Sequence, residues 1–468
     1  MGIKKGQTLE LTVESTAFKG KGIAKHNGMA IFIPGTAPGD VVEAMVVKKK
    51  KKFLEAKVQR IIEPSDIRVE PVCSHAKACG GCTWQHIPYS SQLTFKEQHV
   101  RDHIERIAHM DPDLVLPIVG SDEPLYYRNK MEYSFGTRRW LTEDEIRSDE
   151  FVDDSGFSAG LHAPGRFDKI LNLNECHLQH TISFKILDFV REYCLENGID
   201  AYDTYKRSGF MRNLVIRNSH YTDDLMINFV TNEDRQDIIE SLSDKLLVAF
   251  PEITTIVNNI NDQPNPTAVG RYEKTIFGSG YIVDKIGGLS FKIHSNAFFQ
   301  TNTRQAEKLY SVARQFAEGT SGDHLFDLYC GVGTLTLFMA DTFGKVTGIE
   351  LIDVAIENAN FNKNENNINN VDFILGDMKD ILNEEFVSSR GKPDCVITDP
   401  PRSGMHPDVL KQLISLKAER LVYVSCNPST MARDLKELKE VYNVEKIQPV
   451  DMFPQTYHIE AVAQLSAK

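Results

Sequence analysis

The segment from Asp323 to Glu350 reads DHLFDLYCGVGTLTLFMADTFGKVTGIE and contains a strand, a glycine turn, a helix and a second strand. Apolar runs at 323–329 and 345–349 predict the strands, and the apolar spacing of 334–342 predicts the helix between them. The two glycines of the CGVG turn let the backbone bend tightly and approach a ligand, and the start of the helix offers free N–H groups. This unit is typical of a doubly wound parallel α/β sheet.

The same alternation of helix and strand extends from Thr303 towards the end of the chain. The periodic segments are five strands at 323–329, 345–349, 371–375, 394–398 and 420–425, and four helices at 303–317, 334–342, 352–364 and 429–440. Residues 291–468 are therefore expected to form a Rossmann-like domain with a largely parallel sheet.

Acidic residues follow successive strands of this predicted sheet. Glu350 ends the second strand, Asp377 follows the third, and Asp399 begins the sequence Asp-Pro-Pro after the fourth. The carboxyl ends of parallel strands share one edge, and an acid about twenty residues after the glycine turn can accept both ribose hydroxyls of a nucleoside. The order resembles an S-adenosylmethionine-dependent methyltransferase, because it lacks the second glycine pair of a dinucleotide enzyme and the phosphate-binding Lys of a P-loop enzyme.

Cys426 follows the predicted strand 420–425 on the same edge. Most cysteines that end strands are packing residues, but a thiolate added to C6 of uracil makes C5 electron-rich enough to attack a methyl sulfonium. A base must then remove the C5 proton. A free thiol is only a few per cent ionised at neutral pH, so the site must promote its ionisation or its attack. Glu460 becomes a candidate for that base only through the family resemblance that follows, because such a residue taken alone would be expected at the surface.

Four motifs in this order resemble the RNA uracil-5-methyltransferase family, and within it the bacterial 23S ribosomal RNA type. They are Asp327-Leu-Tyr-Cys-Gly-Val-Gly333, Asp399-Pro-Pro-Arg-Ser-Gly404, Ser425-Cys-Asn-Pro-Ser-Thr430 and His458-Ile-Glu460. The resemblance covers essentially the whole chain and implies S-adenosylmethionine-dependent methylation of C5 of a specific uridine, giving 5-methyluridine. It implies Cys426 as the nucleophile of a covalent Cys–C6 adduct and Glu460 as the base.

The resemblance also implies which residues contact the methyl donor. They are Gln300, Tyr329, Glu350, Asp377 and Asp399. Tyr329 replaces a frequent Phe, and Thr334 stands where some members have Asn, so no cofactor contact is assigned to Thr334. Asp399 has an alternative role in reading the uracil edge. Arg402 has three possible roles, which are contact with phosphate, contact with a base, or a structural ion pair.

Three of the eight cysteines, Cys73, Cys79 and Cys82, lie close together in the sequence. In a reducing compartment such a group is more often metal-binding or catalytic than disulfide-bonded. A [4Fe–4S] cluster needs a fourth ligand, and the family resemblance implies Cys176. Zinc is the rival metal, since four thiolates suit it equally. A cluster with four cysteine ligands has no open iron site, so its expected role is to hold the RNA-binding central domain in shape.

Residues 1–63 are expected to form an OB-like barrel, and they resemble the TRAM domain of the family. They carry 12 Lys and Arg against 6 Asp and Glu, although the whole chain has a net charge of −12. The run Lys48–Lys52 is either a solvated hairpin or a patch that contacts phosphates. Residues 64–290 are expected to form a mostly β central domain with RNA contacts, with helices at 93–109 and near 182–197 and a long strand at 281–293.

The composition is that of an ordinary globular protein, with 41% hydrophobic and 25% charged residues in 468 residues. No apolar run approaches the ~20 residues of a membrane helix, and the first residues lack the apolar core of a secretory signal. We expect a cytoplasmic monomer that does not bind membranes. Its expected RNA is 23S ribosomal RNA, with transfer RNA as the alternative, and the target uridine should be single-stranded or flipped out of its stack.

Three other classes of protein share parts of this pattern. A radical methylthiotransferase also combines iron–sulfur with a TRAM domain, but it needs Cys-x3-Cys-x2-Cys, whereas the spacing here is Cys73-x5-Cys79-x2-Cys82. An amine methyltransferase also uses Asp-Pro-Pro, but its loop ends in an aromatic residue where Arg402 stands. A non-catalytic RNA-binding protein does not need the ordered cofactor residues, and a cofactor titration separates it from an enzyme.

Overall fold

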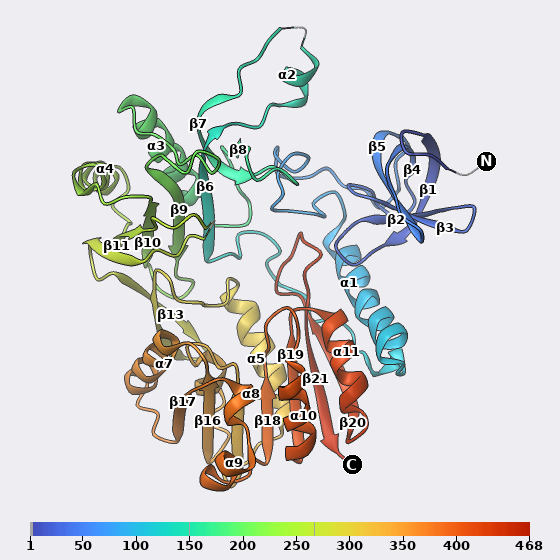
Figure 1. Ribbon diagram of the computed structural model, residues 1–468, viewed down its shortest axis with the longest axis vertical. Helices are drawn as coiled ribbons and strands as arrows, with labels where there is room; N and C mark the ends of the chain where they lie inside the picture. Colours follow the sequence, from blue (N-terminus) through green and yellow to red (C-terminus); the bar gives the residue numbers. More distant parts are fainter. Residues whose placement is uncertain (1–2, 149, 266) are drawn as a thin grey trace.

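The computed structural model describes residues 3–148, 150–265 and 267–468. It contains a closed barrel, a central seven-stranded sheet, a two-stranded hairpin and a C-terminal seven-stranded sheet. Figure 1 shows the barrel beside the central sheet, with the C-terminal sheet below both. Among the described helices, none has the length and apolar character needed to cross a lipid bilayer.

The N-terminal barrel has five strands in the order β1-β2-β3-β5-β4. The strands are β1 (Thr8–Thr16), β2 (Gly22–His26), β3 (Met29–Ile33), β4 (Val41–Lys49) and β5 (Phe53–Glu63). Alternate side chains of β1, among them Leu9, Leu11 and Val13, are buried in the barrel, as the two-residue period of a strand requires. The expected small barrel is confirmed.

A helical segment connects the barrel to the rest of the chain. Helix α1 (Tyr89–His103) continues as one π-helical turn at Ile104–Ala108, so it begins four residues before the predicted start at 93. Trp84, just before α1, is fully buried, and its Nε1 donates to the carbonyl of Gly20 at 3.1 Å. This contact fastens the barrel to the start of the helix.

The central sheet has the strand order β12-β11-β10-β9-β6-β7-β8. Its strands are β6 (Lys130–Arg138), β7 (Ser155–His162), β8 (Ile170–Asn172), β9 (Met211–Asn218), β10 (Leu225–Thr231), β11 (Thr255–Ile260) and β12 (Tyr272–Phe277). A short helix, α2 (Glu143–Arg147), lies between β6 and β7. Helix α3 (Ile182–Glu196) confirms the helix expected near 182–197.

A second helix of the central region, α4 (Gln236–Ala249), was not expected from the sequence. It packs against α3 and shares one apolar core with the sheet. Its buried residues Ile239, Leu242 and Leu246 follow the three- and four-residue spacing of a helix face. The description of this region as mostly β is therefore incomplete.

The long strand predicted at 281–293 is in fact a hairpin of β13 (Tyr281–Ile286) and β14 (Leu289–His294). Gly287 and Gly288 form its turn with φ values of 58° and 82°. Two-residue hairpin turns that match the strand twist need positive φ at both central residues, and glycine adopts such angles without steric cost. The Gly-Gly pair was thus the local signal that divides the strand.

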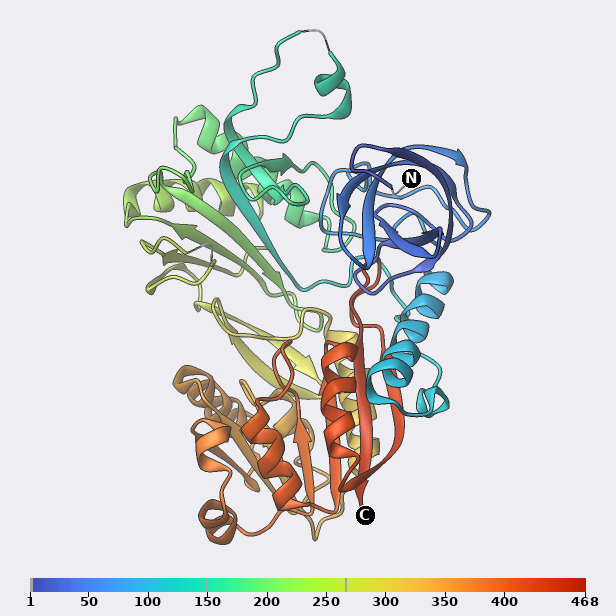
Figure 2. The ribbon, with the colours of Figure 1, turned by 45° about the vertical axis from the view of Figure 1, so that its right-hand side comes forward.

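The C-terminal sheet has the order β17-β16-β15-β18-β19-β21-β20. Its strands are β15 (His324–Leu328), β16 (Lys345–Glu350), β17 (Val371–Leu375), β18 (Cys395–Thr398), β19 (Arg420–Ser425), β20 (Tyr442–Val450) and β21 (Glu460–Ala467). The helices are α5 (Thr303–Ala317), α6 (Thr334–Phe338), α7 (Asp353–Glu365), α8 (Met378–Ile381), α9 (Glu384–Arg390), α10 (Pro407–Leu416) and α11 (Pro428–Leu438). The first five strands are parallel, β21 runs antiparallel to β19, and β20 runs antiparallel to β21. The Rossmann-like fold is confirmed (Figure 2).

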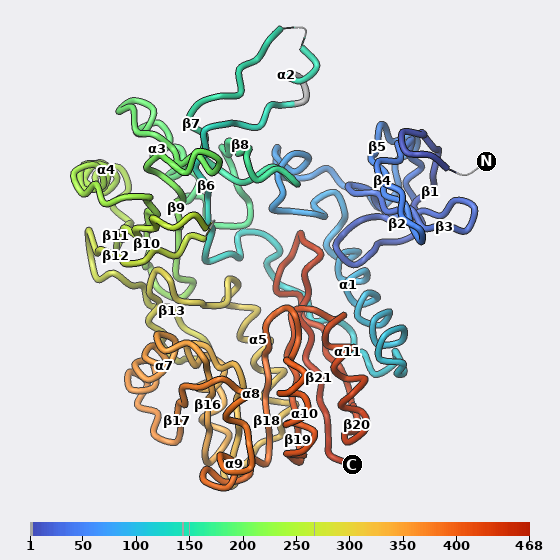
Figure 3. Tube along the Cα trace, in the orientation of Figure 1, coloured from blue at the N-terminus to red at the C-terminus, as the bar shows by residue number. Residues whose placement is uncertain are grey.

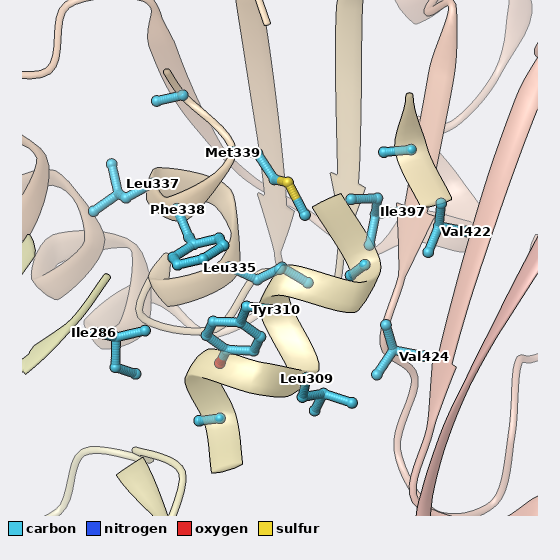
Figure 4. Close-up of a cluster of buried hydrophobic side chains, with 14 of the residues drawn as sticks. Ile286, Leu309, Tyr310, Leu335, Leu337, Phe338, Met339, Ile397, Val422 and Val424 are labelled. Atoms are coloured by element: carbon cyan, nitrogen blue, oxygen red, sulfur yellow. The ribbon is translucent and has the colours of Figure 1, made fainter. Parts of the chain in front are cut away.

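One face of this sheet is covered by α5 and by the start of α6 (Figure 4). Leu309 and Tyr310 of α5 are buried together with Leu335 of α6 and with Val422 and Val424 of β19. Fully burying one such side chain contributes about 1.5–3 kcal/mol. Because α6 begins at the glycine turn, this packing holds the turn against the sheet.

Candidate active site

A cavity of about 1440 Å³ opens at the carboxyl edge of the C-terminal sheet. Four of the five residues predicted to contact a methyl donor line it, and they follow β15, β16, β17 and β18 in turn. They are Tyr329, Glu350, Asp377 and Asp399. The cavity exceeds the roughly 300–1,000 Å³ of a typical small-molecule site, so it has room for a second ligand beside a nucleoside cofactor.

The carboxylate of Glu350 is held by three backbone N–H groups. Its Oε2 accepts from Gly331 at 3.0 Å, and its Oε1 accepts from Leu351 at 2.7 Å and from Ile352 at 2.9 Å. A Cβ atom at Gly333, whose φ is 81°, would lie 2.6 Å from Phe373 Cζ, so only glycine fits there. Sequence and packing together fix the carboxylate at the mouth of the cavity.

Two further acids of the cavity have different electrostatic surroundings. Asp377 caps α8, and its pKa is lowered by the hydrogen bond from Lys379, whose Nζ lies 2.8 Å from Asp377 Oδ2. Burial instead raises the pKa of Asp399 to about 7. Asp377 is therefore ionised at neutral pH, whereas Asp399 is poised between its two protonation states.

Gln300, the fifth predicted contact, is buried and does not line the cavity. Its carbonyl accepts from Asn129 Nδ2 at 2.8 Å, and its side chain hydrogen-bonds Tyr310. The hydroxyl of Tyr310 also pairs with Thr334 Oγ1 at 2.9 Å. Gln300 and Thr334 are thus linked to each other through the buried hydroxyl of Tyr310.

Cys426 and Glu460 are brought together by strand pairing. Ser425 of β19 lies opposite Ala461 of β21 in the antiparallel register, so the next residues, Cys426 and Glu460, face each other at the sheet edge. Burial, with the nearby charges of Glu460 and Asp399, raises the pKa of the Cys426 thiol to about 12. Burial and Asp399 also raise the pKa of Glu460 well above its usual value. The positive charge of Arg402 acts in the opposite direction on Cys426 and Glu460 and offsets part of the increase in both pKa values.

The residues that flank Cys426 fix its backbone. Ser425 Oγ accepts from the N–H of Asn427 at 3.1 Å, and Asn427 Oδ1 accepts from the N–H of Ser429 at 3.1 Å, which caps α11. Asn427 Nδ2 donates to the carbonyl of Arg402 at 3.0 Å. Cys426 therefore sits at a pinned turn between β19 and α11, beside the Asp399-Pro-Pro loop.

Arg402 contacts His458 rather than a carboxylate. The guanidinium Nη2 lies 2.8 Å from His458 Nδ1, and within the described part of the chain Arg402 makes no ion pair. Burial and the charge of Arg402 lower the pKa of His458 to about 4, so this imidazole is neutral at pH 7 and can accept from Arg402. The structural ion pair considered for Arg402 is thus absent from the described residues.

Comparison with known proteins identifies the family to which the chain belongs. A model of the tRNA (uracil-5-)-methyltransferase family matches residues 267–468, and a TRAM domain model matches residues 3–59. A protein of Bacteroides thetaiotaomicron, named an uncharacterized RNA methyltransferase, is 41% identical over 97% of this chain and 100% of its own. A protein of the same description from Chlorobaculum tepidum is 40% identical over 98% of this chain and 96% of its own. The chain belongs to this RNA methyltransferase family.

A solved structure shares the whole architecture of this RNA methyltransferase. The crystal structure of the Pyrococcus abyssi tRNA (uracil-54, C5)-methyltransferase, in complex with S-adenosyl-L-homocysteine, superposes with a TM-score of 0.75. The two proteins are 29% identical, and the match covers 98% of this chain and 100% of the other. The fold expected from the sequence is therefore that of a known methyltransferase over its full length.

In the methyltransferase, the segment that precedes Glu460 is tied to α1 by a buried ion pair. We call this segment, Asp451–Ile459, the strap. Lys96 Nζ donates to Asp451 Oδ1 at 2.6 Å and to the carbonyl of Phe453 at 3.0 Å, and both charged side chains are fully buried. Removing one partner of such a pair costs about 3–5 kcal/mol, because it leaves a buried charge unpaired.

The strap is also tied to the segment that contains the cysteines (Figure 3). The side chain of Gln92 pairs with Gln455 through two hydrogen bonds of 3.0 and 2.9 Å. The N–H groups of Thr83 and Trp84 both donate to the carbonyl of Gln455, at 2.8 and 3.0 Å. These positioning residues were not expected from the sequence, because no local pattern connects them to the end of the chain.

The four predicted metal ligands of the methyltransferase come from neighbouring segments. Glu175 Oε1 accepts from the N–H of Ser74 at 2.5 Å, which brings Cys176 beside the loop of Cys73, Cys79 and Cys82. Burial and the neighbouring thiols raise the pKa of Cys73 to about 11 and that of Cys82 to about 12.

These thiols fit the chemistry of a metal centre, since a bound cation favours the thiolate form. Nevertheless, among the residues that the structure describes, no group of three or more His, Cys, Asp or Glu side chains is arranged to hold a metal ion. The donor set is thus present while an assembled centre is not shown.

Proposed function

We propose that this protein transfers a methyl group from S-adenosylmethionine to C5 of a specific uridine in 23S ribosomal RNA, giving 5-methyluridine. The observation that carries the proposal is the meeting of Cys426, Glu460 and Asp399 at the edge of the cavity. A thiol, a carboxylic base and a nucleoside-sized site are the three parts that C5 methylation of uracil requires. In this proposal residues 1–63 and 64–290 bind the RNA, and residues 291–468 perform the reaction.

S-adenosylmethionine supplies an electrophilic methyl carbon when it is bound. Glu350 would accept hydrogen bonds from its ribose hydroxyls, because the carboxylate is already oriented by the glycine turn. Tyr329, Asp377 and Asp399 would line the rest of its site. The family resemblance adds the buried Gln300 to these contacts. The S-adenosyl-L-homocysteine bound to the Pyrococcus abyssi enzyme supports this choice of donor.

The side chains of the cavity edge then divide the reaction between them. The Cys426 sulfur bonds to C6 of the uracil, and the electron pair released towards C5 forms the new bond to the methyl carbon. The bond from that carbon to the sulfonium sulfur would break at the same time, which leaves S-adenosyl-L-homocysteine. Glu460 takes the proton from C5, and the C6–S bond breaks to restore the uracil ring and the thiolate. Arg402, the nearby cation that lowers the pKa of Cys426, favours the thiolate. The target base has to leave its stack to reach this site.

Binding of S-adenosylmethionine is expected to tighten as the pH rises through 7. The pKa of Asp399 is about 7, so its ionised fraction rises about tenfold between pH 6 and pH 8. The ionised form attracts the positive sulfonium, and the affinity should increase by up to about tenfold over this range. Calorimetric titration at both pH values measures it. S-adenosyl-L-homocysteine is the control, because it lacks the positive charge. An equal pH effect on both ligands would contradict the role of Asp399.

Transfer RNA is the second candidate substrate, because the structural neighbour of Pyrococcus abyssi acts on tRNA. Mass spectrometry of 23S ribosomal RNA and transfer RNA fragments, from cells with and without this protein, tests both candidates. Loss of 5-methyluridine from a ribosomal fragment supports the proposal. Loss confined to transfer RNA selects the alternative, and unchanged 5-methyluridine in both RNAs rejects this activity.

We also propose that Cys73, Cys79, Cys82 and Cys176 hold a [4Fe–4S] cluster that keeps the central domain in shape. The change Cys79→Ser is then expected to lower iron and acid-labile sulfide content, visible absorbance, thermal stability and RNA affinity together. Cys194→Ser, in the core of α3, is the control for loss of a buried thiol. Zinc in place of iron in the purified protein, or full stability and RNA affinity without the cluster, would refute this role.

A further inference from the structure

Two aromatic side chains contact each other on the surface of the central region. Phe167 lies in the loop between β7 and β8, and Tyr205 lies in the turn at 203–208. Their ring centroids are 5.5 Å apart, and the side chains are 62% and 67% exposed. We call Phe167 and Tyr205 the aromatic pair. Neighbouring aromatic rings that remain in water are a common mark of an interaction site.

The backbone on both sides of the aromatic pair is well supported. Asp203 Oδ1 accepts from the N–H groups of Tyr205 and Lys206, each at 2.9 Å. In the facing loop Arg166 forms a two-pronged ion pair with Asp168, at 2.9 and 2.8 Å. Both rings are thus presented by ordered turns, which lowers the entropic cost of binding a ligand.

Charges of both signs lie near the aromatic pair, because Asp168 pairs with Arg166 and Asp203 interacts electrostatically with Lys206. The side chains of Lys206 and Arg207 are exposed, and over the described part of the chain neither takes part in an ion pair. Arg166 is close enough to Tyr205 for the two to interact electrostatically. Aromatic faces beside unpaired cations suit a ligand with flat rings and negative charges, which is the chemistry of single-stranded nucleic acid.

The loop that carries Phe167 precedes an edge strand of the central sheet. The loop of Phe167 leads into β8, the edge strand of the central sheet and the strand nearest the barrel in Figures 1 and 2. Gly80, in the cysteine segment, packs against the base of this loop, and its Cβ position is 3.5 Å from the carbonyl of His162 and 3.6 Å from Pro164. The cysteine segment therefore supports the loop that presents Phe167.

We propose that the aromatic pair is a stacking platform for unpaired bases of the RNA that flanks the target uridine. This inference rests on the proposed function, since it assumes an RNA substrate. Bases in a duplex are stacked on one another and expose no free face, so the platform selects single-stranded RNA. Lys206 and Arg207 contact the phosphates beside the stacked bases, in a sequence-independent manner.

The test compares binding of two fluorescein-labelled probes to the full-length protein. The first probe is single-stranded oligouridine of about 16 nucleotides, and the second is the same strand annealed to oligoadenosine. We expect Phe167→Ala and Tyr205→Ala each to weaken binding of the single strand about tenfold, and to leave duplex binding within about twofold. Tyr205→Phe should restore binding, because it keeps the stacking face and removes only the hydroxyl.

Phe151→Ala is the matched control, because Phe151 is a 93% exposed ring with no ring neighbour in the described residues. Thermal unfolding and S-adenosylmethionine affinity should be the same in all these variants and in the wild type. Unchanged single-strand affinity in the Phe167→Ala, Tyr205→Ala double variant overturns the proposal and leaves the surface to another partner, such as a protein. Equal losses for single strand and duplex, or for Phe151→Ala, also overturn it.

Failure of the platform is distinguishable from failure of the proposed function. If the double variant binds single-stranded RNA normally while the wild type methylates uridine, only the platform is wrong. If wild-type protein that binds S-adenosylmethionine neither binds RNA nor methylates it, the proposed function fails and the platform fails with it.

Discussion

Replacing Cys426 with alanine is expected to abolish methylation while leaving the affinity for S-adenosylmethionine within about twofold. Cys426 does not line the cavity that holds the predicted donor contacts, so its loss leaves the cofactor site intact. Without the sulfur, C5 of uracil is not nucleophilic, and the rate should fall by at least about 10³-fold. Transfer of radioactive methyl groups to RNA measures the rate, and calorimetry measures the affinity.

Trapping of the covalent RNA adduct tests the assignment of Cys426 as the nucleophile independently of the rate. In RNA substituted with 5-fluorouracil, C5 carries fluorine in place of the proton that the base must remove, so the adduct cannot break down. Wild-type protein should form a cross-link that maps to the peptide Ser425–Pro428, and the Cys426→Ala variant should form none. Cys194→Ala, which removes a thiol from the core of α3, should retain both activity and cross-link. Normal turnover by Cys426→Ala, or a cross-link mapping elsewhere, contradicts the mechanism.

Replacing Glu460 with glutamine is expected to make a covalent RNA adduct accumulate. The glutamine has nearly the same shape, so the buried site should remain folded, but its amide cannot take the C5 proton. Sulfur addition and methyl transfer would then proceed while release of Cys426 stalls. We expect multiple turnover to fall about 10²–10⁴-fold. A protein–RNA band that survives denaturing electrophoresis and carries one labelled methyl group per protein measures the adduct.

Glu445→Gln is the matched control for this substitution. Glu445 is an exposed carboxylate on β20, the strand that pairs with β21, and its replacement should change neither turnover nor adduct level. Burial and Asp399 raise the pKa of Glu460, so the fraction of wild-type enzyme with an ionised base increases with pH. Wild-type turnover should therefore rise with pH. Adduct formation by the Glu460→Gln variant should lack the part of this pH dependence that comes from ionisation of Glu460. Release of free product at the wild-type rate by Glu460→Gln would assign the base to another residue.

The strap explains how distant parts of the chain can influence this base. Lys96 binds the start of the strap, and Gln92 pairs with Gln455 near its middle. Close to its end, the ring of Tyr457 packs against Phe18 of the barrel, with centroids 6.1 Å apart, and stacks on His458 at 4.1 Å. The barrel and α1 thus contact the same short segment that leads into Glu460.

The sequence by itself determined the five parallel strands of the C-terminal sheet and the acidic residues at the carboxyl ends of three of them. Helix 303–317 and strands 371–375 and 420–425 have the predicted bounds. These predictions succeed because hydrophobic period and glycine turns are local signals. Glu350, Asp377 and Asp399 meet at one edge because the carboxyl ends of parallel strands always share an edge.

Only the tertiary structure decided which distant residues meet. Cys426 faces Glu460 because β21 inserts antiparallel between β19 and β20, and no local period encodes that strand order. Lys96 and Asp451 are 355 positions apart, yet they form a fully buried ion pair. Such pairs depend on how whole elements pack, since a charge is buried only where folding brings its partner.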